Sequence, residues 1–244
     1  ISSLLEARNG LLWVAAKGGG IRGLSASEDP IALTENDGLP TNEVITLFED
    51  LEANLWVGTD GGGLVRIRTE LFESFEPRKA NESDMRLDEI HVNSVVEDST
   101  HDLWIATEGQ GLLHWEGEGT HSVYGLDKPT ATVLLHDSMG QVWCGTRQKG
   151  LDVFLPSEES RDRFQFEPVD AFLGETIVSL FEDSSRNVWV ASDQALGRLS
   201  IGNFQASPTW PLGAMNDVRC ILEDAERRMW FGTADRGVFR WSDG

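Results

Sequence analysis

The sequence has few cysteines and no long hydrophobic run. Its 2 cysteines, Cys144 and Cys220, lie in apolar segments of repeats that are not neighbours, so we expect two buried free thiols and no disulfide. No segment approaches the ~18 consecutive apolar residues of a transmembrane helix, and the N-terminus lacks a basic-then-apolar signal pattern. Because the chain opens inside a repeat, we expect a mature or excised piece of a longer protein.

Basic residues are also scarce. The 20 Lys and Arg residues are outnumbered by 41 Asp and Glu residues, which gives a formal net charge of −21. The resulting negative field repels phosphate backbones and anionic lipids, which disfavours binding to nucleic acid or to a membrane surface. Membrane attachment is expected only through segments outside this chain. The 25 glycines, nine tryptophans and missing helical periodicity favour many short strands, so we predict an all-β fold.

A tryptophan recurs along the whole chain at intervals of 39 to 48 residues, at Trp13, Trp56, Trp104, Trp143, Trp189 and Trp230. Around each one, a short apolar segment ends in polar residues, a turn follows, and a second apolar segment carries the tryptophan, which predicts a β-hairpin. An aspartate precedes five of the tryptophans by six residues, at Asp50, Asp98, Asp137, Asp183 and Asp224. We expect each carboxylate to cap the turn; the first repeat has Ala7 there.

Each tryptophan is followed two residues later by Ala or Gly, which suits packing of one sheet on the next. A third strand follows a Gly turn in five repeats, whereas the fifth repeat loses one turn residue before Leu196. Outer fourth strands are expected at 72–75, 121–124 and 164–166. Repeats of this size predict a β-propeller of six approximately 43-residue four-stranded blades.

We predict one β-propeller domain over residues 1–244, with blades at approximately 1–40, 41–87, 88–128, 129–173, 174–213 and 214–244. The last blade lacks its outer strand after Trp241. The ring is therefore either imperfectly closed or a fragment of a larger propeller.

The second repeat, "DGLPTNEVITLFEDLEANLWVGTDGGGL" from Asp37 to Leu64, resembles the two-component regulator propeller repeats of bacterial sensor proteins. The resemblance implies a sensory domain, usually periplasmic, placed before a transmembrane helix and a cytoplasmic histidine kinase or diguanylate cyclase. It also implies recognition of glycans or other small molecules, or signalling through a dimer. Asn42 of this motif is replaced by Ile90, Pro129 and Glu175 in the intervening repeats.

Two glycine patterns look like phosphate-binding motifs but lack their context. Gly18–Gly23 satisfies G-x-G-x-x-G, yet it joins two expected strands and opens no helix. Gly145–Gly150 has P-loop spacing, but Leu151 and Asp152 replace the residues that bind phosphate and magnesium. Both segments are interpreted as turns between the second and third strands.

We expect no metal site, no cofactor and no catalytic residues. The histidines, at positions His91, His101, His114, His121 and His136, show no H-x-H or H-x-x-x-H spacing. The turns Asp50–Asn54, Asp98–Asp102 and Asp183–Asn187 lack the dense carboxylates of calcium loops. No nucleophile-elbow sequence is present.

The candidate binding face is formed by two sets of loops. In a propeller, the turns between second and third strands and the loops that lead into each first strand gather at one face, where polar groups of several blades converge. The predicted ligand-binding residues are Asn42, Glu43, Asp60, His91, Glu108, Gln110, Arg147, Gln148, Asp193, Gln194, Asn216, Asp235 and Arg236. Such a mixture suits sugar hydroxyls or a peptide.

Three functions are weighed. The preferred hypothesis is a non-catalytic, periplasmic sensor propeller of a bacterial signalling protein, which binds a small molecule such as a glycan, or a partner protein, and which can form a homodimer. The second is a scaffold for protein–protein interaction. The third is a propeller lyase resembling virginiamycin B lyase, which would need His91 with Glu43 or Glu175 as base and acid.

Overall fold

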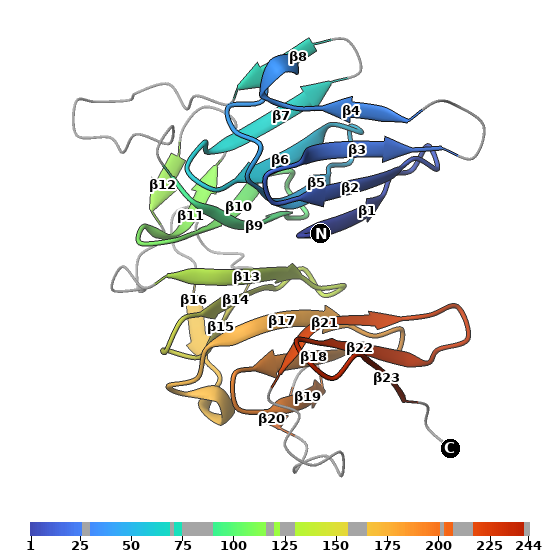
Figure 1. The fold of residues 1–244 in the computed structure, drawn as a ribbon. Coiled ribbons are helices and arrows are strands. Elements are labelled where there is room, and N and C mark those ends of the chain that lie inside the picture. The colour runs from blue at the N-terminus through green and yellow to red at the C-terminus, as the bar shows by residue number, and fades with distance from the viewer. Residues whose placement is uncertain are drawn as a thin grey trace. The chain divides into compact units, whose positions relative to one another are not determined.

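The computed structural model describes residues 1–25, 30–68, 71–74, 90–115, 120–122, 130–155, 165–200, 203–206 and 217–241. These residues form short antiparallel strands and two 3₁₀ helices, η1 (Glu35–Asp37) and η3 (Asp170–Phe172). The chain divides into two compact units, Ile1–Lys128 (unit 1) and Pro129–Gly244 (unit 2). Figure 1 shows the strands of each unit as a set of small sheets. Within the described ranges, no helix has the length and apolar character needed to cross a membrane.

Unit 1 contains three four-stranded sheets. Sheet 1 consists of β1 (Ser3–Glu6), β2 (Leu12–Ala16), β3 (Gly20–Leu24) and β4 (Ile31–Leu33). Sheet 2 consists of β5 (Val44–Glu49), β6 (Leu55–Thr59), β7 (Leu64–Arg68) and β8 (Leu71–Ser74). Sheet 3 consists of β9 (Val92–Glu97), β10 (Leu103–Thr107), β11 (Gly111–Trp115) and β12 (Thr120–Ser122).

Unit 2 contains two four-stranded sheets and one three-stranded sheet. Sheet 4 consists of β13 (Ala131–His136), β14 (Val142–Thr146), β15 (Leu151–Leu155) and β16 (Gln165–Pro168). Sheet 5 consists of β17 (Ile177–Glu182), β18 (Asn187–Ser192), β19 (Leu196–Ser200) and β20 (Asn203–Ala206). Sheet 6 consists of β21 (Val218–Glu223), β22 (Met229–Thr233) and β23 (Val238–Trp241).

Strands follow the chain order within every sheet, and each is antiparallel to the next. We call them A, B, C and D, and we call the connections between them the A–B turn, the B–C turn and the D–A loop. The hairpins predicted around each tryptophan are the A–B pairs, and sheet 6 has three strands as expected. The outer strands β4 and β20 complete predicted four-stranded blades, but their residues were not predicted. Predicted outer-strand residues Phe75, Tyr124 and Phe164 lie outside the described residues.

Sheets pack face to face within each unit through their inner strands. In unit 1, β5 packs on β1 and β2, and β9 packs on β5 and β6; in unit 2, β17 packs on β13 and β14, and β21 packs on β17 and β18. The indole of Trp56 joins the same apolar cluster as Ile90 and Val92 from the following sheet. This stacking explains the periodic spacing of the tryptophans.

In sheets 2 and 4, the glycine two residues after the tryptophan is required by this packing. A Cβ atom on Gly58 would lie 2.9 Å from Val92 Cγ1 of the next sheet, and one on Gly145 would lie 2.7 Å from Ile177 Cβ. Four of the indoles are nearly inaccessible, with 0% to 2% exposure at Trp56, Trp104, Trp143 and Trp189. These four tryptophans therefore belong to the core.

The two cysteines differ in environment. Both are free thiols, but Cys144 is buried whereas Cys220 is exposed, so the prediction of a buried Cys220 is wrong. Cys220 pairs with Gly232 in sheet 6, on the face where no further described sheet of unit 2 packs. Burial raises the pKa of the Cys144 thiol, and the negative charge of Asp152 raises it further.

Candidate functional site

The aspartate of the A–B turn holds both the turn and the indole. In sheet 2, Asp50 Oδ1 accepts the Asn54 backbone N–H at 2.8 Å, and Oδ2 accepts the Trp56 indole N–H at 2.8 Å. The same indole bond joins Asp98 to Trp104, Asp137 to Trp143, Asp183 to Trp189, and Asp224 to Trp230, at 2.6 to 2.8 Å. The predicted turn cap is therefore confirmed. The indole bond was missed, although the constant spacing of six residues was its signal.

The glutamate before this aspartate links one sheet to the sheet before it. Glu49 accepts the backbone N–H of Arg8 at 2.9 Å, and Glu97 accepts that of Leu51 at 2.9 Å. In unit 2, Glu182 binds Ser138 and Glu223 binds Ser184 in the same way. At the A–B end of each unit, these glutamates therefore bind the turn of the preceding sheet.

At the opposite end of the sheets, the B–C turns of sheets 2 to 6 are each tied to a D–A loop. Turn residues donate their backbone N–H groups to loop carbonyls in five pairs: Asp60 to Glu43, Glu108 to His91, Arg147 to Thr130, Asp193 to Thr176, and Ala234 to Asp217, at 2.8 or 2.9 Å. The two loop sets therefore lie together inside each unit. This edge is the candidate site.

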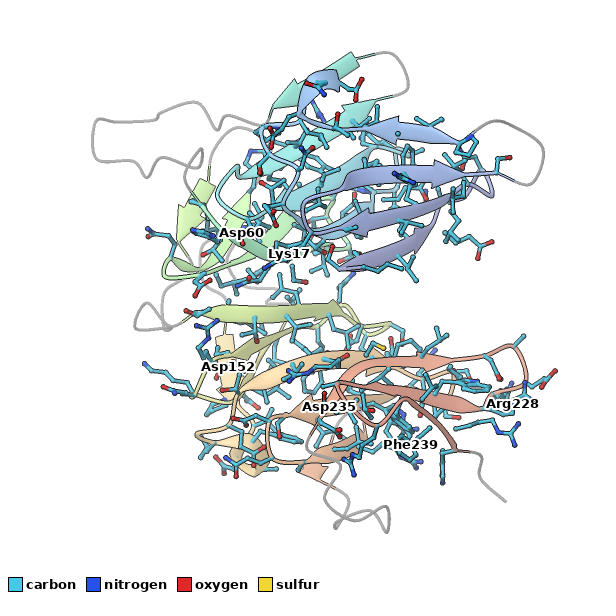
Figure 2. The ribbon with its side chains drawn as sticks, in the orientation of Figure 1. Lys17, Asp60, Asp152, Arg228, Asp235 and Phe239 are labelled. Carbon is cyan, nitrogen blue, oxygen red and sulfur yellow. The ribbon has the colours of Figure 1, made fainter. Side chains whose placement is uncertain are left out.

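Three side chains from consecutive sheets meet at this edge in unit 1. Asp60 in the β6–β7 turn lies 3.7 Å from the Lys17 ammonium of the β2–β3 turn. Its other oxygen contacts Nδ1 of His91, which precedes β9. The side chains are 64% (Lys17), 34% (Asp60) and 48% (His91) exposed. Figure 2 shows Lys17 and Asp60 beside one another. Two donors flanking one carboxylate form a polar group that solvent and ligands can reach.

The other predicted residues of unit 1 differ in role. Asn42 is tied down locally, because its Oδ1 accepts the Glu35 N–H at 2.9 Å and its own N–H binds the Glu35 carboxylate at 2.8 Å. The Glu43 carboxylate lies close to Gly18, where a Cβ would be 3.4 Å from Oε1. Glu108 and Gln110 are exposed residues of the β10–β11 turn.

In unit 2, Thr176 connects two B–C turns. Its hydroxyl accepts the Gln148 N–H at 3.3 Å, and its own N–H donates to Asp193 Oδ1 at 3.0 Å. The side chains of Arg147, Gln148 and Gln194 lie on the exposed edge. This arrangement places residues of sheets 4 and 5 in one polar patch.

Sheet 6 contributes an ion pair. Arg236 Nε donates to Asp217 Oδ2 at 2.9 Å, and the second guanidinium nitrogen contacts Oδ1. This hydrogen bond from Arg236 lowers the pKa of Asp217, although burial opposes the shift. Asp235 is exposed beside it, and the predicted residue Asn216 lies outside the described residues.

The acid–base arrangement considered for a lyase differs from the expected one. His91 contacts Asp60 rather than Glu43, and the Glu175 carboxylate accepts a hydrogen bond from Ser192 Oγ. Because Nδ1 of His91 contacts the Asp60 carboxylate, the other ring nitrogen, Nε2, is directed away from Asp60. A histidine that acts as a general base has this arrangement. Away from this edge, Asp98, Asp102 and His114 form a group with metal-ligand chemistry.

Comparison with known proteins supports the predicted fold and the resemblance. The two-component regulator propeller family matches residues 213–235, which include β21 and β22. The chain therefore carries a repeat of this family, as the second repeat had suggested. Sequence comparison with curated proteins finds no match.

Three solved structures illustrate the likeness. The extracellular domain of BT4673, a one-component system candidate from B. thetaiotaomicron, is 19% identical with a TM-score of 0.70, over 100% of this chain and 33% of that one. Virginiamycin B lyase from Staphylococcus aureus, catalytically inactive and with quinupristin, is 12% identical with a TM-score of 0.73, over 98% of this chain and 83% of that one. The β-propeller domain of Cps50 (Swd1) from Myceliophteria thermophila is 13% identical with a TM-score of 0.71, over 100% and 84%.

These likenesses establish the fold as a β-propeller. The chain spans about a third of the length of the BT4673 domain. At such identities a shared fold carries no shared function, so the function has to be argued from the site.

Proposed function

We propose that the chain is the ligand-binding propeller of a bacterial signalling protein, located outside the cytoplasm and without catalytic activity of its own. The propeller repeat at residues 213–235 and the likeness to the extracellular domain of BT4673 support this role. The observation that carries it is the contact of Lys17, Asp60 and His91, three side chains from different sheets, at an exposed edge.

A glycan, or another small molecule rich in hydroxyl groups, fits this edge best. The Asp60 carboxylate accepts hydrogen bonds from hydroxyl groups, whereas Lys17 donates to their oxygens. His91 does either, according to its tautomer. A partner protein presents the same groups through its polar side chains, so it is the alternative ligand.

A thermal-shift titration of the full chain with a panel of glycans and cell-envelope fragments tests the proposal. At least one compound should raise the melting temperature in a saturable way. Asp60→Ala should abolish the response, and Leu51→Ala, an exposed residue of the opposite A–B end, should retain it. A panel without any saturable response, or a response that survives Asp60→Ala, would overturn the proposal.

A second candidate, protein–protein assembly, is favoured by sheet 6. Strand β23 pairs with β22 on one side, and the described residues supply no fourth strand on the other. Its Val238 is 68% exposed. Open strand edges accept further strands, so homodimerisation through this edge is expected if assembly is the function. Light scattering that shows only monomers of the full chain would count against a homodimer.

The lyase alternative rests on a single contact, that of His91 with Asp60. Incubation with quinupristin, the compound found with virginiamycin B lyase, discriminates the two roles. We expect the compound to remain intact. Its consumption by the wild type, but not by His91→Ala, would replace the sensor with an enzyme.

A single domain over residues 1–244 also remains a proposal. If the chain is one cooperative propeller, calorimetry should show one unfolding transition for the full chain. Two separate transitions would show that the two units unfold independently.

A further inference from the structure

Asp98, Asp102 and His114 form a compact cluster in sheet 3. His114 Nε2 lies 3.6 Å from Asp98 Oδ2 and 4.0 Å from Asp102 Oδ2. One ligand atom from each residue lies within 4.8 Å of the other two. The two aspartates belong to the β9–β10 turn, whereas His114 reaches them from β11, where it pairs with Trp104. This grouping could not be predicted from the sequence, because strand pairing and not local spacing brings the His114 imidazole to the β9–β10 turn.

The other sheets show what normally occupies these positions. Four residues after the capping aspartate, sheets 2, 5 and 6 place a side chain that donates to it: Asn54 to Asp50 at 2.7 Å, Asn187 to Asp183 at 2.9 Å, and Arg228 to Asp224 at 2.7 Å. Sheet 3 places Asp102 there instead. A carboxylate cannot donate a hydrogen bond, so the usual donor is replaced by a second negative charge.

The position of His114 also differs between sheets. The residue that pairs with the tryptophan from the third strand is Arg66 in sheet 2, Arg198 in sheet 5 and Arg240 in sheet 6. Each arginine lies over its indole at 5.6 to 5.9 Å. Sheet 3 has a histidine instead, which is 3% exposed and whose ring centroid lies 4.5 Å from that of Trp104. At these two positions, sheets 2, 5 and 6 have a hydrogen-bond donor and an arginine, whereas sheet 3 has a carboxylate and an imidazole.

Two half-buried carboxylates so close together repel one another unless a cation lies between them. The side chains of Asp98 and Asp102 are only 13% and 26% exposed, so water screens them incompletely. Asp98 accepts the Trp104 indole N–H at 2.7 Å and the Asp102 backbone N–H at 3.1 Å, and the Thr100 hydroxyl lies 2.7 Å from an oxygen of each aspartate. These donors are neutral, so they do not offset the two negative charges.

We propose that Asp98, Asp102 and His114 bind one divalent metal ion of the zinc class. One imidazole nitrogen with two carboxylate oxygens is a ligand set that suits zinc and related transition metals, whereas calcium and magnesium prefer oxygen ligands alone. Tetrahedral coordination at metal–ligand distances of about 2.0–2.2 Å places the ligand atoms about 3.3–3.6 Å apart, so the 4.0 Å between His114 and Asp102 has to close by about half an ångström. The partly exposed Asp102 side leaves room for water to complete the shell. The ion would link the β9–β10 turn to β11.

Calorimetric titration of the metal-stripped full chain with zinc chloride tests this site. We expect one saturable site per chain in the micromolar range or tighter, a higher melting temperature with zinc, and no such effect from calcium or magnesium. Cobalt(II) bound at the same site should give visible absorption bands, which report the ligands independently of stability.

The sister sheets supply variants that keep the fold. His114→Arg and Asp102→Asn introduce residues found at the equivalent positions of sheet 2, so both proteins should fold, as checked by circular dichroism. Each should weaken zinc binding at least about tenfold. Glu167→Gln, which removes an exposed carboxylate of unit 2, should leave the affinity unchanged.

Two outcomes would overturn the proposal. One is wild-type protein without saturable zinc binding tighter than about 100 µM, the range of adventitious surface sites. The other is a tight site that survives both His114→Arg and Asp102→Asn. The test is independent of glycan binding, which involves the other end of the sheets.

Discussion

The two ends of the sheets are built from the same repeat, yet they differ in what their polar groups do. At the A–B end, the repeated aspartates and glutamates bind backbone N–H groups, indoles and neighbouring turns, as Asp50 and Glu49 illustrate. At the B–C end, the backbone groups pair with one another, and the side chains change from sheet to sheet, as Asp60 and Gln148 illustrate.

This difference separates stability from recognition. Carboxylates that are buried and fully bonded contribute to folding, and replacing them leaves unsatisfied donors. Exposed side chains on backbone-anchored turns contribute little to folding, so they are free to vary with the ligand. We therefore expect substitutions at the A–B end to change stability and substitutions at the B–C end to change binding.

The largest expected effect is at Asp50, which is 6% exposed. Asp50→Ala removes the acceptor of the Trp56 indole and of the Asn54 backbone and side-chain N–H groups. Because buried donors are left without partners, the free energy of unfolding should fall by about 3 kcal/mol, measured by urea denaturation. Asp50→Asn retains an acceptor and should lose less. A loss below about 0.5 kcal/mol would show that the capping aspartate is dispensable.

A smaller loss is expected at Glu182, which binds the backbone and hydroxyl of Ser138 in the preceding sheet. Glu182→Gln keeps the shape of the side chain but removes the charge, so these hydrogen bonds weaken by about 1 kcal/mol. Urea denaturation should detect this change. The exposed Glu167 supplies the matched control, since Glu167→Gln should have no effect. Equal losses in the two variants would argue against a specific link between sheets.

Sheet 1 offers the reverse experiment. It has Ala7 where the other sheets have aspartate, and its Trp13 is less buried than Trp56. Ala7→Asp should supply the missing acceptor for the indole and the turn, and it should raise the free energy of unfolding by up to about 1 kcal/mol. Thermal unfolding monitored by tryptophan fluorescence is the measurement. A destabilised Ala7→Asp protein would mean that the bond depends on more than the aspartate itself.

The acid sensitivity of the A–B end should be visible at Asp224. Burial acts to raise its pKa, but hydrogen bonds from Trp230 and Arg228 hold the pKa below the ordinary value of 3.8. A folded-state pKa below the unfolded one adds stability above the unfolded value, and this stability is lost as the pH falls from there. The melting temperatures of wild type and Asp224→Asn should therefore keep a constant difference from neutral pH to about pH 5 and converge as the pH falls further towards about pH 3. Parallel curves would contradict this assignment.

The smallest effect on stability is expected at the B–C end. Lys17→Ala removes an exposed ion pair with Asp60 and should change the free energy of unfolding by less than about 0.5 kcal/mol. Chemical denaturation checks this value. A larger loss would place the candidate binding edge among the structural parts of the propeller.

Sequence reasoning went furthest where one interaction repeats. The tryptophan spacing predicted the hairpins, the small neighbours predicted the packing between sheets, and the position of Asp50 predicted the turn cap. Such features are local, so each repeat displays them in the same order. The positions of the outer strands β4 and β20 were not predicted because edge strands place few demands on their residues.

Contacts that depend on strand pairing or on packing between sheets were also not predicted from the sequence. The bond from Glu49 to Arg8 spans 41 residues, and the approach of His114 to Asp98 depends on strand register. Cys220 was taken as buried from its apolar strand, but its face in unit 2 is uncovered by any described sheet of that unit. At the candidate site, the sequence indicated which loops cluster. It did not indicate that His91 would pair with Asp60 and not with Glu43.

A paired comparison of Asp50→Ala and Asp60→Ala tests the division between the two ends most directly. Each variant is assayed for its free energy of unfolding and for its thermal shift with the best compound of the glycan panel. Asp50→Ala should lose stability and still bind, whereas Asp60→Ala should keep its stability and no longer bind. Loss of stability in Asp60→Ala, or unchanged binding in it, would contradict the assignment of recognition to the B–C edge.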